Sequence, residues 1–149
     1  MKHVWSIICN RCITDQETNS ISLIDVIEEF NIRIDKKRFK NEGKVMIPSN
    51  FNITHLILKD ENMEVERGSI LIEFFDPSGK KHKNELIQKI EIGKSHKRIR
   101  ARFLIGAMSF KEPGRYIFSV KMKGEKDKKY KKVAELPLDV NFNETAEKK

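Results

Sequence analysis

The chain has 149 residues and a net charge of +8 at pH 7, with 35% charged and 38% apolar residues. This length predicts one domain that buries a hydrophobic core of its own. The apolar run at residues 4–9 is too short to span a bilayer and lacks the cleavage site of a signal peptide. We therefore expect a cytoplasmic protein that makes no membrane contact.

The basic excess lies in the second half of the chain. Residues 1–79 hold 10 basic and 13 acidic side chains, whereas residues 80–149 hold 20 and 9, a net charge of +11. A basic half is a hint of an anionic partner. Lysine-rich strand faces and loops that are simply solvated explain the same excess, so both interpretations stay open.

The first predicted strand covers residues 4–13 and carries apolar side chains on both faces, and a polar turn follows at residues 15–19. The next run, residues 20–30, fits two structures. Its Ile, Val and Ser content and the strand pattern that continues through residues 31–34 favour a hairpin, which we predict. The alternative is a helix that starts with a capping-box pattern. Its apolar face would hold Leu23, Val26, Ile27 and Phe30.

The middle of the chain predicts a charged connection at residues 35–43 and an extended segment at residues 46–49, because a residue before proline avoids the helical region. Two apolar strands cover residues 51–59 and 69–75. The turn signal Asp-Pro-Ser-Gly at residues 76–79 ends the second of them.

Two later strands alternate clearly between apolar and polar side chains, the period of a half-buried strand. In residues 98–105 the apolar face holds Ile99, Ala101, Phe103 and Ile105. After a Pro-Gly turn at residues 113–114, the apolar face holds Tyr116, Phe118, Val120 and Met122. A Gly-x-Tyr opening is typical of a late strand in immunoglobulin-like sandwiches, but it also fits any antiparallel sheet with such a turn.

Strands at residues 86–92 and 133–142 complete the pattern. Pro137 lacks an amide proton, so the last strand is expected at a sheet edge or with a bulge. About eight short strands without a sustained helical period predict an all-β fold, an immunoglobulin-like antiparallel sandwich of two sheets. We expect one domain over residues 1–142 and a frayed tail over residues 143–149. The predicted core consists of Ile72, Phe74, Ile99, Phe103, Tyr116, Phe118, Val120, Leu138 and Val140.

Five short motifs also suggest a relationship. A strand, a polar turn and a second strand occupy residues 9–15 and 19–27, followed by Asp-Pro-x-Gly at 76–79, Gly-x-Tyr-x-Phe at 114–118 and Glu-Leu-Pro-Leu-x-Val at 135–140. This arrangement resembles a family of small uncharacterised bacterial proteins, a domain of unknown function, over nearly the whole domain. The resemblance implies an immunoglobulin-like β-sandwich and no activity. The chain departs from it at Asp25, where that family has glycine.

The sequence contains no recognisable catalytic or metal-binding motif. Cys9 and Cys12 supply only two of the four ligands that structural zinc needs, and no second cysteine pair exists. The four histidines lack ligand spacing, and the motifs of hydrolases, P-loop proteins and zinc proteases are missing. We expect no enzyme activity, no metal and no cofactor, with Cys9 a small buried side chain.

An anion-binding row is the best candidate for a site. Arg98, Arg100 and Arg102 would share one strand face about 7 Å apart. Five lysines could extend the row: Lys80, Lys81, Lys83, Lys94 and Lys97. The alternative is a solvated face whose arginines pair across strands with Glu73 or Glu91.

Two function classes follow from these observations. The first is a non-enzymatic binding or structural module, an accessory protein-interaction domain for an unidentified protein partner, because a sandwich pattern comes without a catalytic constellation. The alternative is weak, sequence-independent binding of nucleic acid or another polyanion by the basic second half. Trp5 and Tyr130 are the aromatic residues that could stack on bases.

Overall fold

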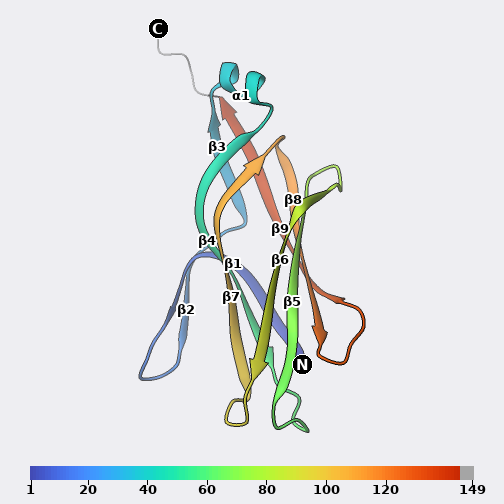
Figure 1. Ribbon diagram of the computed structural model, residues 1–149. Coiled ribbons are helices and arrows are strands. Elements are labelled where there is room, and N and C mark those ends of the chain that lie inside the picture. Colours follow the sequence, from blue (N-terminus) through green and yellow to red (C-terminus); the bar gives the residue numbers. More distant parts are fainter. Residues whose placement is uncertain (145–149) are drawn as a thin grey trace.

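The computed structural model describes residues 1–144, apart from the side chains of residues 36–38. It is a sandwich of two β-sheets with one short helix (Figure 1). The elements are β1 (Lys2–Thr14), β2 (Ile21–Val26), β3 (Glu29–Ile34), α1 (Lys36–Glu42), β4 (Val45–Leu58), β5 (Glu66–Phe75), β6 (Lys81–Ile92), β7 (Arg98–Phe110), β8 (Gly114–Gly124) and β9 (Lys131–Glu144).

The strand orders are β2-β1-β4-β7 in one sheet and β3-β9-β8-β5-β6 in the other. The predicted all-β sandwich is therefore confirmed. Neighbouring strands run antiparallel except β3 and β9, which run parallel with Glu29 opposite Asp139. The parallel pair arises because the chain leaves the four-stranded sheet after β2 and, with two residues between, joins the other sheet at Glu29.

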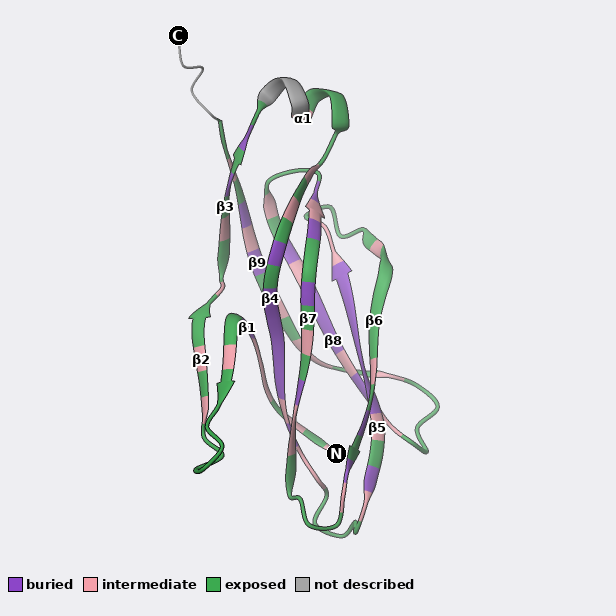
Figure 2. Ribbon diagram, turned by 60° about the vertical axis from the view of Figure 1, so that its left-hand side comes forward, coloured by how far each residue is buried: buried purple, intermediate pink, exposed green. Residues whose placement is uncertain are grey.

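One hydrophobic cluster joins the facing sides of the two sheets. Seven of the nine predicted core residues are buried, and Ile99 and Phe103 pack against the cluster from half-buried positions. Figure 2 shows the buried positions concentrated along the central strands of both sheets. Alternation along each strand thus identified the core correctly.

Tyr116 of the Gly-x-Tyr motif lies near the start of β8. Its side chain is fully buried, and its hydroxyl donates to the main-chain O of Glu112 at 2.8 Å. Gly114 precedes it with φ 137°, and a Cβ at Gly114 would lie 2.9 Å from Pro77. Glycine is therefore required where this turn approaches the turn between β5 and β6.

The hairpin of β1 and β2 folds back over the outer face of the four-stranded sheet. Two strands separate β2 from β7 in the sheet order, yet Arg100 on β7 donates to Oδ1 and the main-chain O of Asn19 at 3.0 and 2.8 Å. Arg102 likewise donates to the main-chain O of Cys12 at 3.1 Å. In Figure 1 the hairpin tip points toward the same end of the molecule as the N-terminus. We call residues 10–26 the hairpin arm.

The structure decides between the alternatives for residues 20–30 and corrects the prediction for residues 35–43. Residues 20–30 contain β2 and the start of β3, so the helix is wrong; β2 forms a hairpin with β1, whereas β3 belongs to the other sheet and does not pair with β2. The predicted charged connection instead contains α1, which ends at Gly43 with φ 64°, where the amide of Gly43 donates to the O of Phe39 at 2.8 Å. Such a left-handed glycine is a common helix terminator. A seven-residue charged helix is too short to show a period.

The last strand extends further than expected. Asn143 and Glu144 pair with β3, so β9 reaches Glu144, and only residues 145–149 of the predicted tail lie outside the described residues. Pro137 pairs with Ile117 on β8 and lies before the segment that β3 covers, so β9 has one neighbour there. No helix among the described residues is long and apolar enough to cross a membrane.

Candidate functional site: a cleft between two strand edges

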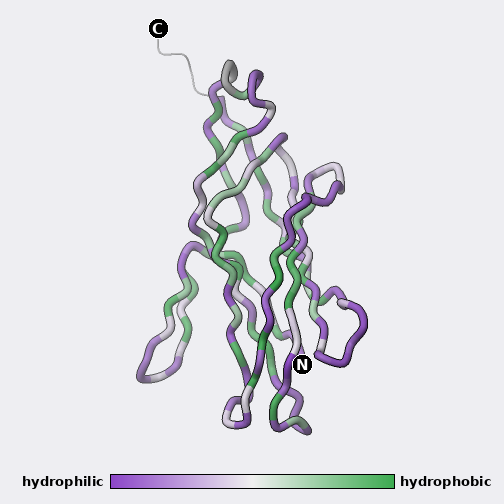
Figure 3. Tube along the Cα trace, viewed as in Figure 1, coloured by the Kyte–Doolittle hydropathy of each residue, from purple (hydrophilic) through white to green (hydrophobic). Residues whose placement is uncertain are grey.

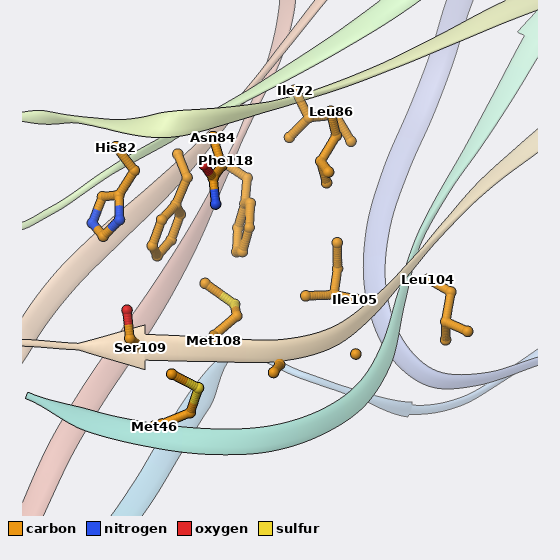
Figure 4. A pocket seen from close by; sticks show the side chains of 13 residues that line it. Met46, Ile72, His82, Asn84, Leu86, Leu104, Ile105, Met108, Ser109 and Phe118 are labelled. Carbon is orange, nitrogen blue, oxygen red and sulfur yellow. The ribbon is translucent and has the colours of Figure 1, made fainter.

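An apolar cleft of about 350 Å³ opens between β6 and β7, the last strands of their sheets. In Figure 4, Ile105 and Met108 point from β7 into this space, toward Ile72 and Phe118 of the opposite sheet. Thirteen residues line it: Met46, Ile72, Phe74, His82, Asn84, Leu86, Leu104, Ile105, Gly106, Ala107, Met108, Ser109 and Phe118. The hydrophobic core is thus accessible at one side of the sandwich.

The cleft exists because β6 and β7 part from each other. The Gly93 turn joins them at one end, where the amide of His96 donates to the O of Gly93. The lining residues come from the early part of β6 and the late part of β7, far from this turn. A bulge in β4 between Pro48 and Phe51 shifts the register of β7 beside the cleft. Bulges bend a strand and re-aim its side chains.

Aromatic rings form the inner wall of the cleft. Phe74 packs against Phe118 and Tyr116 with ring centroids 4.7 and 5.3 Å apart, and against Phe110 at 6.5 Å. These contacts span both sheets, since Phe110 belongs to β7. The wall is therefore part of the packed core, and it is preformed for a ligand.

A few polar groups stand beside this apolar wall. His82, Asn84 and Ser109 line the cleft, and the His82 ring lies 4.5 Å from that of Phe74. Partial burial lowers the pKa of His82, against the opposing effect of Asp76. His82 is consequently neutral at pH 7 and offers one donor and one acceptor.

Both edges of the cleft carry free main-chain groups. Within the described residues, β6 pairs only with β5, and β7 pairs only with β4. Exposed apolar side chains stand beside these edges: Leu104 is 68% exposed, Met46 59% and Leu86 36%. A strand edge with free amides and carbonyls next to apolar side chains is a template for pairing with another chain.

The predicted arginine row is located on the outer face of β7. Arg100 and Arg102 bind the hairpin arm, while Arg98 is exposed at the start of the strand. The predicted alternative partners were wrong. Glu91 pairs with Arg67 at 2.7 Å, and Glu73 pairs with two lysines.

The five predicted lysines do not join the row as one patch. Lys80, Lys81 and Lys83 lie at the start of β6, whereas Lys94 and Lys97 follow its end. Nine residues of β6, 84–92, separate Lys83 from the turn that carries Lys94 and Lys97, a distance of about 30 Å. Lys81 is held between Glu73 and Glu85, and Lys94 pairs with Glu64. Anion binding by this set stays a prediction.

The two cysteines lie away from the cleft. Cys9 is fully buried, Cys12 is partly exposed, and both are free thiols. Burial raises the pKa of the Cys9 thiol. Among the side chains that the structure describes, no three or more His, Cys, Asp or Glu residues group together in a way that could hold a metal ion.

A pair of histidines linked through Ser6, with His55 buried and His3 half-buried, was missed at the sequence level. His3 Nε2 lies 2.7 Å from Ser6 Oγ, which lies 2.6 Å from His55 Nδ1. His55 is fully buried, its Nε2 has no hydrogen-bond partner among the described residues, and burial lowers its pKa to about 4. The register of β1 on β4, with Ser6 opposite His55, brings the three together.

The cleft was also missed, although its side chains were visible as apolar positions of predicted strands. A signal existed in Leu104, an apolar residue in phase with the three arginines on the outward face of its strand. Comparison with known proteins adds no further indication. No protein-family model matches the sequence, and the curated proteins contain no match to it.

Proposed function

We propose that the protein is a non-enzymatic protein-interaction module that takes an extended segment of a partner polypeptide into the cleft between β6 and β7. One observation carries this proposal: an accessible part of the hydrophobic core lies between two strand edges without neighbours, within the described residues. A single extended segment can satisfy both features, because its main chain pairs with an edge while alternate side chains fill the cleft.

The dimensions and the rim fit such a segment. A volume of about 350 Å³ falls in the range of binding pockets and suffices for a few side chains, not for a folded domain. Leu86 and Leu104 flank the opening on opposite strands. Asn84 and Ser109 can bind a polar side chain or a main-chain amide of the segment.

A displayed library of random ten-residue peptides tests the proposal. We expect selected peptides to share alternating apolar residues and to bind at least about tenfold more weakly after Leu104→Glu. The matched control is Ile87→Glu, at another exposed apolar residue of an edge strand, outside the cleft. Gly106 lines the cleft, and a Cβ there meets no atom within 4 Å, so Gly106→Phe should fold normally. Its ring should then occupy the cleft and block peptide binding. Selected peptides that bind equally well after both Leu104→Glu and Gly106→Phe, or that lose as much affinity after Ile87→Glu, would contradict the proposal.

An immunoglobulin-like relationship and a cytoplasmic location belong to the same proposal. The Tyr116 hydroxyl bound to the main chain four residues upstream supports the first, since such a tyrosine corner recurs in these sandwiches. Two free cysteine thiols support a reducing compartment.

A further inference from the structure

The hairpin between β8 and β9 concentrates the basic charge of the molecule. Residues 121–132 contain seven lysines and two acidic residues. Lys121 pairs with Glu73, Lys132 pairs with Glu135 at 2.7 Å, and Lys123 lies over the Tyr130 ring. The other lysines are exposed and have no ion-pair partner within residues 1–144: Lys126, Lys128, Lys129 and Lys131. Figure 3 shows this loop as one of the most hydrophilic segments of the chain.

The acidic residues of the same hairpin do not neutralise these lysines. Asp127 Oδ2 accepts a hydrogen bond from the amide of Gly124 at 2.9 Å, so its carboxylate faces the base of the loop. Glu125 interacts electrostatically with Arg67, which also pairs with Glu91. The positive charges of Lys126, Lys128 and Lys129 at the loop tip are therefore not neutralised by these two carboxylates.

A groove of about 510 Å³ lies beside this loop on the outer face of β5, β6 and β8. Its charged lining consists of Lys89, Lys123, Glu125 and the Arg67–Glu91 ion pair, and Ile87, 59% exposed, supplies an apolar surface. Tyr130 forms its wall and is fixed by a 2.9 Å hydrogen bond between its hydroxyl and Ser69 Oγ. Because Tyr130 is the loop residue next to Lys129, this bond ties the loop to the sheet and lowers the entropy cost of ordering it.

We propose that this groove and loop bind single-stranded nucleic acid through its phosphates, with bases resting on Ile87. Cations beside an apolar surface match a chain that alternates phosphates and bases. A bilayer surface is flat and cannot enter a groove, and an acidic peptide would bind the lysines without using Ile87. The site is separate from the cleft between β6 and β7, since the two share no residue.

Fluorescence anisotropy with labelled dT20 tests the proposal. Three phosphate contacts on a single strand contribute about 2 to the slope of log affinity against log salt. We expect the K126Q/K128Q/K129Q variant to lose about that slope and to bind about tenfold or more weakly at 50 mM salt. The matched control, K2Q/K44Q/K111Q, removes the same charge from exposed lysines outside both the hairpin and the predicted arginine row, and it should keep the slope.

Further binding measurements distinguish single-stranded nucleic acid from an acidic peptide and an anionic membrane. Ile87→Gln should weaken dT20 binding several-fold and leave the slope unchanged, because it removes no charge. Poly-glutamate and vesicles containing phosphatidylserine should bind at least tenfold more weakly than dT20. Equal losses in the two triple variants, no binding at 50 mM salt, or equal binding of poly-glutamate or vesicles would each overturn the proposal.

Discussion

Asp25 adopts φ 53°, a left-handed backbone conformation that disfavours residues with a Cβ. It lies at the base of the hairpin arm, and its one side-chain bond is a long contact of 3.5 Å from Asn10. Glycine would suit this position. We expect Asp25→Gly to be more stable than Asp25→Val by about 2 kcal/mol, because a β-branched residue is strained at positive φ.

The neighbouring strand position Ser22 is the control, because it is exposed and its φ is not positive. There the order should reverse, with Ser22→Val at least as stable as Ser22→Gly. Urea unfolding of the four variants measures both differences. The same order at the two sites would show that φ at Asp25 has no role.

His55 makes stability depend on pH. Burial, with a smaller effect of His3, lowers its pKa from 6.5 to about 4. Below pH 6.5 the unfolded chain binds a proton that the folded chain refuses, so stability is complete above that pH and falls as the solution becomes acidic. The expected loss between pH 7 and pH 5 is about 2 kcal/mol.

Urea unfolding at the two pH values, with His55→Gln as the comparison, measures this loss. The variant should lose much less stability over that range, even if it is less stable at pH 7. His3 and His82 also have lowered pKa values. The stability of the variant should therefore still fall slightly as the pH is lowered. Identical pH profiles for both proteins would contradict the assignment to His55.

At the level of elements, arginines from β7 hold the hairpin arm. Arg100 makes two hydrogen bonds to Asn19. We expect Arg100→Ala to raise hydrogen-exchange rates of arm amides roughly fivefold, equivalent to about 1 kcal/mol for partly exposed charged hydrogen bonds. Arg98→Ala is the matched control, since Arg98 lies on the same face without a bond to the arm. Equal rates in the two variants would show that Arg100 does not hold the arm.

Strand positions were predictable because alternation is a local property of the sequence. The run through Tyr116 and Phe118 is an example: its period alone identified the buried face. The crossing of the chain into β3 and its parallel pairing with β9 depend on long-range contacts that no local pattern reports. The cleft could not be predicted from the sequence for the same reason. Its prediction requires knowing that β6 and β7 are both edge strands.

The anion-binding prediction shows the same limit. The period of Arg98, Arg100 and Arg102 correctly placed them on one outer face, but the folded-back arm that occupies two of them could not be read from spacing. Conversely, the lysine-rich loop was visible in the sequence, and only its structure shows that Tyr130 fixes it beside a groove.

Over the whole molecule, one core holds the two sheets together, and Phe118 is at its centre. Its ring lies 4.7 Å from Phe74 in the same sheet and 6.1 Å from Phe51 in the other, measured between centroids. We expect Phe118→Ala to lower the free energy of unfolding by about 3–5 kcal/mol, the usual cost of deleting a buried aromatic ring. Ile117→Ala is the matched control, because Ile117 is only half-buried and alternates to the opposite face of β8. Its cost should stay below about 2 kcal/mol.

Because the core is shared, both sheets should unfold in one transition. Trp5 fluorescence reports on β1 in the four-stranded sheet, and far-ultraviolet circular dichroism reports on all strands. Urea curves from the two probes should coincide in the wild type and move together to lower urea in Phe118→Ala, with an unchanged m-value. Separate midpoints would mean that the sheets unfold independently, and a loss below about 1 kcal/mol would mean that Phe118 does not join them.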